Sequence, residues 1–313
     1  MLNAAALRHA LKFRPDVTLS AHIVTSPAAV AIRRALGARI VQYFYAEEIG
    51  AKPKLAAFAA RQANEVVAIS SYTAGLITAT GVVPASMRLI SPGVDVPSDS
   101  TPLVADRPTL LTISRIAERY KGHDVLVRAL PLVRANVPAV EWIVIGDGGL
   151  RPGVEQLAHS YGVADSCRFL GSVSDQQRNS WLRRADLLAM PSRLPSGGLA
   201  GEGFGIVYLE AGAYGKPVLA GDVGGALDAV ADGENGVLVD PTDPVAVADA
   251  IAGLLLDREL AGRLGRAGEE RAQRFAWPVI VGRVEAVLLE QLAPSSRLRA
   301  LRRRSRGSAR TAA

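Results

Sequence analysis

The stretch Thr109–Ile145, TLLTISRIAERYKGHDVLVRALPLVRANVPAVEWIVI, decides the fold class. It opens with the apolar run 109–113 and closes with the apolar run 140–145, and both runs have the length of a strand. Between them, residues 123–136 place apolar side chains at helical spacing. A strand, a helix and a strand in this order predict two parallel strands joined by a crossover helix, with both faces of the sheet covered.

The same alternation continues on both sides of this stretch. Further strands are expected over 17–20, 39–44, 65–69, 87–90, 167–170, 186–190, 217–220 and 236–239, and further helices over 28–36, 54–64, 71–80, 150–161, 175–183, 205–214, 244–256, 258–274 and 278–292. The segment 91–102 is rich in Pro, Gly and Ser and separates two blocks. The pattern therefore predicts an α/β protein with two Rossmann-like domains facing a cleft, and ligands bind such sheets at the carboxyl ends of the strands.

This pattern also sets the expected domain boundaries. The expected parts are an acceptor-side domain over 1–97, a linker over 98–107, a donor-side domain over 108–275, a helix over 276–292 that packs back toward the first domain, and a disordered Arg-rich tail over 293–313.

The net charge of +6 is concentrated in that tail. Seven arginines and no acidic residue follow from position 297 on, so the rest of the chain sums to −1. A near-neutral body argues against a nucleic-acid-binding protein, which would need a basic face. The tail itself is open to two interpretations, an arm for an anionic membrane surface or a solvated disordered terminus.

Targeting features are absent from the sequence. Cys167 is the single cysteine, so an internal disulfide is excluded and a reducing compartment is expected. The chain has no apolar run of bilayer length, and residues 1–16 lack the order of a signal peptide. We expect a cytoplasmic protein, either soluble or peripheral on the inner face of the membrane.

A glycine-rich loop that opens a helix is the first candidate site. Gly203 and Gly205 leave backbone N–H groups uncovered where the helix begins, and a helix start binds phosphate. Glu202 before the helix and Glu210 within it can accept hydrogen bonds from hydroxyls. This spacing predicts a ligand with both phosphate and sugar hydroxyls. The alternative is an ordinary loop with one surface and one buried glutamate.

Further candidates follow the strands of the same block. Arg115 and Lys121 come after strand 109–113 and can reach a diphosphate, or they are two solvated surface cations. Gly146 and Gly148 end strand 140–145, where glycine lets a ligand approach the backbone. The turn 171–175 can border a nucleotide base. Both this turn and the segment with Gly146 and Gly148 could equally be plain turns.

In this order, the motifs resemble the nucleotide-sugar-dependent retaining glycosyltransferases of family 4, which have the two-domain GT-B fold. The resemblance covers nearly all of residues 66–275 and includes Gly215-Lys216-Pro217-Val218. It implies that no metal or cofactor is needed. By this resemblance, Arg115 and Lys121 bind the donor diphosphate, and Glu202 binds the sugar together with the backbone N–H groups of Phe204, Gly205 and Ile206. Glu210 binds the ribose, and Val173 contacts the base. Further contacts with the donor are implied for Gly146, Gly148 and Gly203.

The resemblance also implies a substrate class. Segment 196–199, SGGL, and segment 205–211, GIVYLEA, are similar to mannosyl-transferring members that act on phosphatidylinositol lipids. The implied reaction moves a sugar from GDP-mannose or a UDP-sugar to a hydroxyl of a carbohydrate or lipid-linked acceptor in glycan or glycolipid synthesis.

Two departures leave an alternative open. The family begins with a strand and a Gly-rich loop, whereas this sequence starts at Met1 in the middle of that domain, so the N-terminal domain is expected to be incomplete. Tyr45 stands where the family often has a catalytic histidine, and Glu48 lies near a common acidic position. His22, after strand 17–20, is a candidate catalytic assistant or a structural residue. A truncated, non-catalytic nucleotide-sugar-binding module is therefore the second hypothesis.

Overall fold

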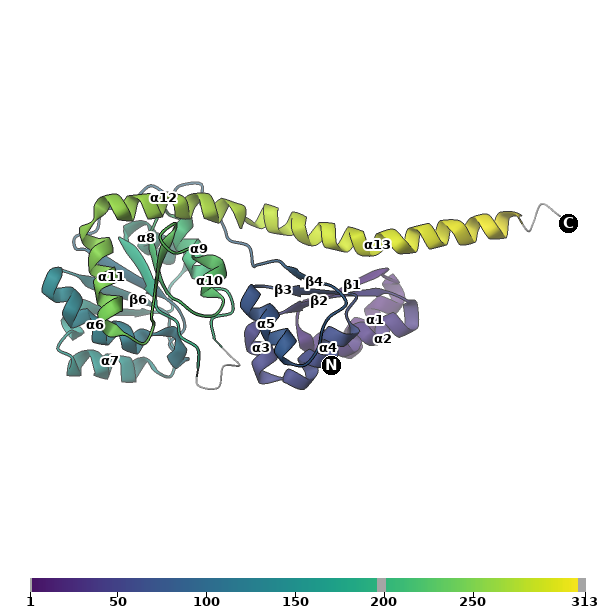
Figure 1. Ribbon diagram of the computed structural model, residues 1–313, viewed down its shortest axis with the longest axis horizontal. Coiled ribbons are helices and arrows are strands. Elements are labelled where there is room, and N and C mark those ends of the chain that lie inside the picture. The colour runs from purple at the N-terminus through teal and green to yellow at the C-terminus, as the bar shows by residue number, and fades with distance from the viewer. Residues whose placement is uncertain (1, 196–200, 309–313) are drawn as a thin grey trace. The chain divides into compact units, whose positions relative to one another are not determined.

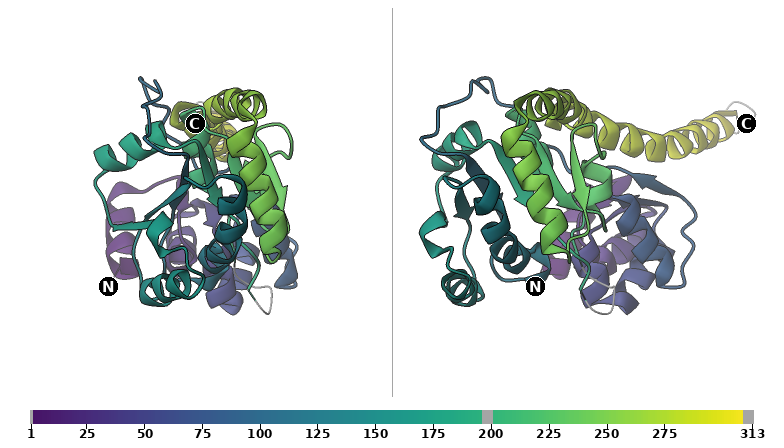
Figure 2. Two further views of the ribbon diagram at one scale, coloured as in Figure 1. Left: turned by 90° about the vertical axis from the view of Figure 1, so that its left-hand side faces the viewer. Right: turned by 60° about the vertical axis from the view of Figure 1, so that its left-hand side comes forward.

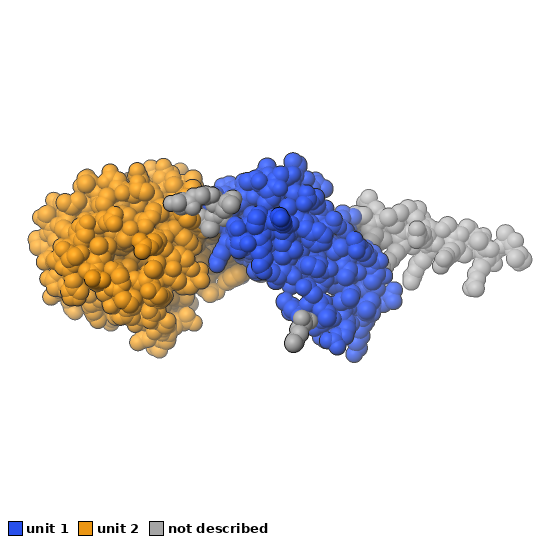
Figure 3. Space-filling model, turned by 90° about the horizontal axis from the view of Figure 1, so that it is seen from below, with its two compact units in different colours: residues 1–91, 278–313 blue, residues 92–277 orange. Residues whose placement is uncertain are grey.

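The computed structural model of the protein describes residues 2–195 and 201–308, with side chains described up to Leu292. The chain divides into two compact units (Figure 3). Unit 1 holds the described residues up to Ser91 and those from Pro278 on, and unit 2 holds Pro92–Trp277. Segment 196–199, which carries part of the family resemblance, lies outside the described residues.

The core of unit 2 is a parallel sheet with helices on both faces (Figures 1 and 2). Its strand order within the described chain is β10-β9-β8-β5-β6-β7. The strands are β5 (Thr109–Ile113), β6 (Glu141–Ile145), β7 (Cys167–Gly171), β8 (Leu187–Met190), β9 (Val218–Gly221) and β10 (Gly236–Val239). The helices are α6 (His123–Asn136), α7 (Arg151–Ser160), α8 (Asp175–Arg184), α9 (Ile206–Ala213), α10 (Ala226–Ala229), α11 (Pro244–Leu256) and α12 (Arg258–Arg274), with 3-10 turns η2 (Arg119–Lys121) and η3 (Ala164–Ser166).

The burial of this sheet explains why its strands are almost wholly apolar. Leu110, Trp142 and Leu187 come from three neighbouring strands and are fully buried. The Trp142 indole donates a hydrogen bond to Thr112 Oγ1 at 2.9 Å, so its polar edge is satisfied inside the core. Because all strands run parallel, the loops that follow them meet at one edge, where the predicted site residues lie.

Unit 1 contains a smaller parallel sheet in the order β1-β2-β3-β4. Its elements are α1 (Leu2–Phe13), β1 (Val17–Ser20), η1 (Ile23–Thr25), α2 (Ser26–Leu36), β2 (Arg39–Phe44), α3 (Ala46–Ala51), α4 (Pro53–Gln62), β3 (Glu65–Ala68), α5 (Ser71–Ala79), β4 (Met87–Leu89) and α13 (Trp277–Ser308). Ile23, Phe44, Ile49 and Val66 are buried together between the sheet and its helices. The prediction of two parallel-sheet α/β domains is therefore confirmed.

Helix α13 is tied to the start of two strands of unit 1. Arg39 Nε donates to Gln291 Oε1 at 2.7 Å, Gln291 Nε2 reaches Glu65 Oε2 at 3.5 Å, and Arg88 pairs with Glu290. These contacts hold the helix residues before Leu292 on the N-terminal part of the chain.

Helix α13 covers Trp277–Ser308 and so extends beyond residue 292, the end that is expected from the sequence. Segment 297–306, RLRALRRRSR, consists mainly of Arg, Leu and Ala, which have high helix propensity. Within the described part of the chain, no helix is both long enough and apolar enough to cross a bilayer.

Candidate active site

The lysine predicted to bind phosphate and the glutamate predicted to bind the sugar lie in direct contact. Lys121 Nζ is 2.7 Å from Glu202 Oε2, and only 13% and 12% of these two side chains are exposed. Lys121 ends the 3-10 turn η2, which follows β5, and Glu202 precedes α9, which follows β8. Loops 81 residues apart thus bring opposite charges together at the carboxyl edge of the sheet.

The start of α9 is held rigidly beside this pair. Gly205 has φ +86°, a left-handed conformation that disfavours other residues, and a Cβ there would overlap the Tyr208 ring. Tyr208 is fully buried, and its hydroxyl donates to the Met190 carbonyl at 2.6 Å. The Gly225 amide donates to the Glu202 carbonyl at 2.8 Å. In the described chain, no side chain caps the helix, so its first amides are open to an anion.

Gly146 and Gly148 allow the loop after β6 to pack closely against the loop after β5. Their φ angles are +127° and +157°, and a Cβ on either would overlap the backbone of segment 114–117. Two hydrogen bonds of 2.9 Å, from Ile116 N to the Asp147 carbonyl and from Leu150 N to the Ile116 carbonyl, join the two loops. The glycines therefore let the chain's own backbone approach, and they fix the loop that carries Arg115.

Arg115 and Val173 lie at the margin of this edge. The Arg115 side chain is 62% exposed, and its Nη2 is 3.0 Å from Glu118 Oε1. Val173 is half-buried in the turn between β7 and α8. Ser174 accepts a hydrogen bond from Gln177 N and caps α8, which fixes the turn.

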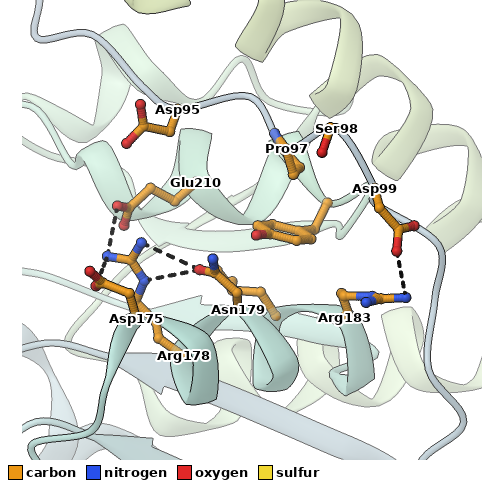
Figure 4. Close-up of a pocket in the computed structure, with 11 residues that line it drawn as sticks. Asp95, Pro97, Ser98, Asp99, Asp175, Arg178, Asn179, Arg183 and Glu210 are labelled. Carbon is orange, nitrogen blue, oxygen red and sulfur yellow. Dashed lines mark hydrogen bonds and ion pairs between the residues drawn. The ribbon is translucent and has the colours of Figure 1, made fainter.

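Glu210 lines a cavity of about 420 Å³ in unit 2 (Figure 4). Arg178 lies between two carboxylates, with its Nη1 3.5 Å from Glu210 Oε1 and 3.7 Å from Asp175 Oδ1. Burial raises the pKa of Glu210, Arg178 lowers it, and Asp95 and Asp175 raise it further. The cavity is lined by Asp95, Pro97, Ser98, Asp99, Asp175, Arg178, Asn179, Leu182, Arg183, Glu210 and Tyr214.

The sequence interpretation missed three residues of this edge. His123 is buried, and its Nε2 is 3.1 Å from Ser114 Oγ, next to Arg115. Burial first, and then Lys121, lower the pKa of His123 to about 4, so its imidazole is neutral at pH 7. Arg178 follows Asp175 at helical i, i+3 spacing, a signal that could have been used. Asp95 lies in the segment 91–102 that is rich in Pro, Gly and Ser, where its sequence position gives no such signal.

Unit 1 places His22 and Glu48 together at the carboxyl ends of β1 and β2. His22 Nδ1 is 2.8 Å from Glu48 Oε2; the imidazole is 51% exposed and the carboxylate 5%. Glu48 also accepts from Ile23 N at 3.0 Å and from Tyr45 N at 3.1 Å. Burial raises the pKa of Glu48, and these amides and His22 lower it. Tyr45 caps α3, and 39% of it is exposed.

Residues 97–271 match the model of a protein family described as Glycosyl transferases group 1. The chain is 38% identical over 216 residues to the GDP-mannose-dependent alpha-(1-6)-phosphatidylinositol monomannoside mannosyltransferase of Mycobacterium tuberculosis H37Rv, covering 66% of this chain and 56% of that protein. It is 35% identical over 256 residues to the protein of the same name from Mycolicibacterium smegmatis, covering 77% of this chain and 67% of that protein. The chain thus spans a little over half the length of the first of these relatives.

Solved structures share the fold. Sucrose-phosphate synthase from Thermosynechococcus elongatus superposes with a TM-score of 0.80 at 23% identity, over 94% of this chain and 78% of that one. The Anabaena protein HepE in complex with UDP gives a TM-score of 0.79 at 24% identity, over 92% of this chain and 82% of that one. These likenesses and the parallel sheets confirm the predicted GT-B fold.

Proposed function

The chain belongs to the glycosyl transferases group 1 family, as its motifs predicted, and we propose that it moves a sugar from a nucleoside diphosphate to an acceptor hydroxyl with retention at the anomeric carbon. The contact between Lys121 and Glu202 carries the proposal. The ammonium can hold a phosphate oxygen, and the carboxylate can accept hydrogen bonds from the sugar. The two charges therefore mark where the phosphate meets the sugar, which is the bond that breaks.

The proposed step develops charge on one side of that bond. As the bond from the anomeric carbon to the phosphate oxygen breaks, its electron pair passes to the nucleoside diphosphate. Lys121, Arg115 and the amides at the start of α9 are fixed donors that stabilise this charge in the transition state. The acceptor oxygen forms the new bond to the anomeric carbon, and the proton of its hydroxyl passes to the departing phosphate oxygen. This donor set needs no metal ion in the proposed reaction.

The nucleoside part of the donor is assigned to Glu210 and Val173. Glu210 can accept hydrogen bonds from both ribose hydroxyls when its carboxylate is ionised. Arg178, at 3.5 Å, favours that ionised form against the burial that opposes it. Val173 offers an apolar contact for the base from the neighbouring turn.

The relatives suggest which donor and acceptor to test. Two relatives are described by name as GDP-mannose-dependent and as mannosyltransferases of phosphatidylinositol monomannoside. We therefore assign GDP-mannose as the donor and a phosphatidylinositol mannoside as the acceptor. We also propose that the protein works at the inner face of the membrane, where a lipid acceptor would lie and where the arginines from 297 on would meet anionic headgroups.

A transfer assay tests this function and separates it from a non-catalytic binding module. The full chain is incubated with GDP-mannose or UDP-glucose and phosphatidylinositol monomannoside. We expect GDP release that depends on the acceptor, and NMR of the product should show an α-linked mannose. Nucleotide binding without any transfer would support the binding module and contradict the enzyme.

A further inference from the structure

A second group of cations lies at the opposite edge of the unit 2 sheet, where the parallel strands begin. Thr109 opens β5 and Glu141 opens β6, and the two are paired in register. Two cavities of about 630 and 500 Å³ lie at this edge. They share five lining residues, which are Val104, Ala105, Asp106, Arg107 and Arg184. The residues predicted to bind the sugar donor follow the carboxyl ends of the strands in this sheet. The edge where the strands begin is therefore separate from them.

Positive charge is in excess around these two cavities. Their walls hold five cationic side chains, Arg107, Arg168, Arg184, Lys216 and Arg258, against three carboxylates, Asp106, Glu141 and Asp186. Two of the carboxylates already have partners. Glu141 pairs with Arg168 at 3.3 Å, and Asp186 Oδ2 accepts from Thr109 N at 2.7 Å. In the described part of the chain, Arg107, Arg184 and Arg258 form no ion pair.

An indole fixes two of the guanidinium groups. The Trp181 ring centroid is 5.4 Å from Arg168 Cζ and 5.8 Å from Arg184 Cζ. Stacking on an aromatic face restricts an arginine without using its N–H donors. Arg184 therefore presents a preorganised fork of donors to both cavities, and less rotamer entropy is lost when an anion binds.

Lys216 adds a buried ammonium to the larger cavity. Only 8% of this residue is exposed, and its Nζ donates to the Arg183 carbonyl at 2.9 Å. That carbonyl lies in the last turn of α8, whose negative dipole end explains the contact. Burial lowers the pKa of Lys216, and nearby Asp186 raises it, but among the described residues no carboxylate forms a direct ion pair with the ammonium. A buried charge is costly unless an opposite charge accompanies it.

We propose that this edge binds a soluble anion that carries phosphate, at a site separate from the sugar donor. Guanidinium forks match the geometry of phosphate oxygens, and Arg107 and Arg184 line both cavities, so one ligand can reach the cations of each. Lys216 and Arg258 would hold its charge from the larger cavity. The site needs no nucleotide, and this proposal does not depend on the glycosyl transfer proposed above.

Pyrophosphate titrations of the full chain test the site. Calorimetry and Trp181 fluorescence are recorded for the wild type, for Lys121→Gln and for the double variant Arg107→Gln/Arg184→Gln. Lys121→Gln weakens the donor edge and leaves the proposed site intact, so this variant should keep a binding event that perturbs Trp181. The double variant should weaken that event by about tenfold or more, because two charge-assisted contacts are lost.

Controls keep the test decisive. Arg107→Lys/Arg184→Lys should recover part of the affinity, and the circular dichroism of both double variants should match the wild type. If Lys121→Gln abolishes all pyrophosphate binding, or if Arg107→Gln/Arg184→Gln weakens none of it, the proposal is wrong. A double variant that loses binding to vesicles of anionic lipid but retains pyrophosphate affinity would likewise overturn the assignment to a soluble anion.

Discussion

Lys121 Nζ lies 2.7 Å from Glu202 Oε2, so in the free protein the residue assigned to the donor phosphate neutralises the residue assigned to the sugar. Both side chains are largely shielded from water, where an unpaired charge would be costly. Their pairing stabilises both charges at the carboxyl edge of the sheet until a sugar donor binds. The donor then supplies phosphate to the lysine and hydroxyls to the glutamate.

Substituting each partner of this pair should have different effects. Lys121→Gln should weaken GDP binding about 10- to 100-fold, since a hydrogen bond to a charged group contributes about 1.5–3 kcal/mol. Glu202→Gln should leave GDP affinity nearly unchanged but lower kcat for transfer by about 100-fold or more, because it contacts the transferred sugar. Calorimetry and the transfer assay measure the two effects. Equal loss of GDP affinity in both variants would contradict the division of roles.

Gly205 should be intolerant of any side chain. Gly205→Ala places a Cβ against the Tyr208 ring in a left-handed conformation, so it should destabilise the protein by about 1–3 kcal/mol and weaken GDP binding. Gly149→Ala is the matched control, because a Cβ there meets nothing within 4 Å. Urea unfolding compares the two variants. A Gly205→Ala protein as stable as Gly149→Ala would show that the turn is not held as described.

Arg178 should affect the ribose selectively. Arg178→Gln removes the cation that favours ionised Glu210, so GDP affinity should fall several-fold while pyrophosphate affinity at the donor edge stays the same. Calorimetric titrations with the two ligands measure this difference, and Arg178→Lys should recover part of the loss. If GDP and pyrophosphate affinities fall together, Arg178 acts on the phosphates instead.

His123 should make stability fall in mild acid. The unfolded chain protonates this imidazole near pH 6.5, whereas the folded chain does so only near pH 4. Since the unfolded state then binds more protons, the free energy of unfolding should decrease as the pH falls from about 6.5 to 4, by roughly 3 kcal/mol in all. Urea titrations across this range should show a shallower decrease for His123→Gln than for a control substitution of the exposed His159. Parallel curves would contradict a buried neutral His123.

The C-terminal arginines should govern membrane binding. Removing residues 297–313 deletes seven positive charges, each contributing about 1 kcal/mol near an anionic surface. Flotation with phosphatidylglycerol vesicles should show at least about tenfold weaker binding at low salt, with GDP affinity retained. Equal flotation of the full and shortened chains would exclude this membrane contact.

The sequence predicted the fold well because apolar runs in buried parallel strands leave little ambiguity. Strands 17–20, 39–44, 109–113 and 236–239 have the predicted bounds. Helix α1 escaped prediction, although its run LNAAALRHALKF is rich in helix-forming Ala and Leu. The short α3 and α10 have too few residues to show a period.

The candidate site was predictable in part. Charged residues after strands had to gather at one edge, and Lys121 and Glu202 do so. Their mutual contact was not predicted, because it depends on how two loops 81 residues apart pack. The packing of Gly146 and Gly148 against segment 114–117 was not predicted, for a similar reason. Glycine marks a close approach, but the sequence does not say whether a ligand or the chain's own backbone approaches.

The most direct measurement for the central claim is a calorimetric titration of the full chain with GDP-mannose, beside Lys121→Gln. Saturable binding that is weakened about tenfold or more in the variant is the result that we predict. Absence of binding to the wild type, or equal affinity in the two proteins, would contradict the assignment of the Lys121–Glu202 edge as the sugar-nucleotide site.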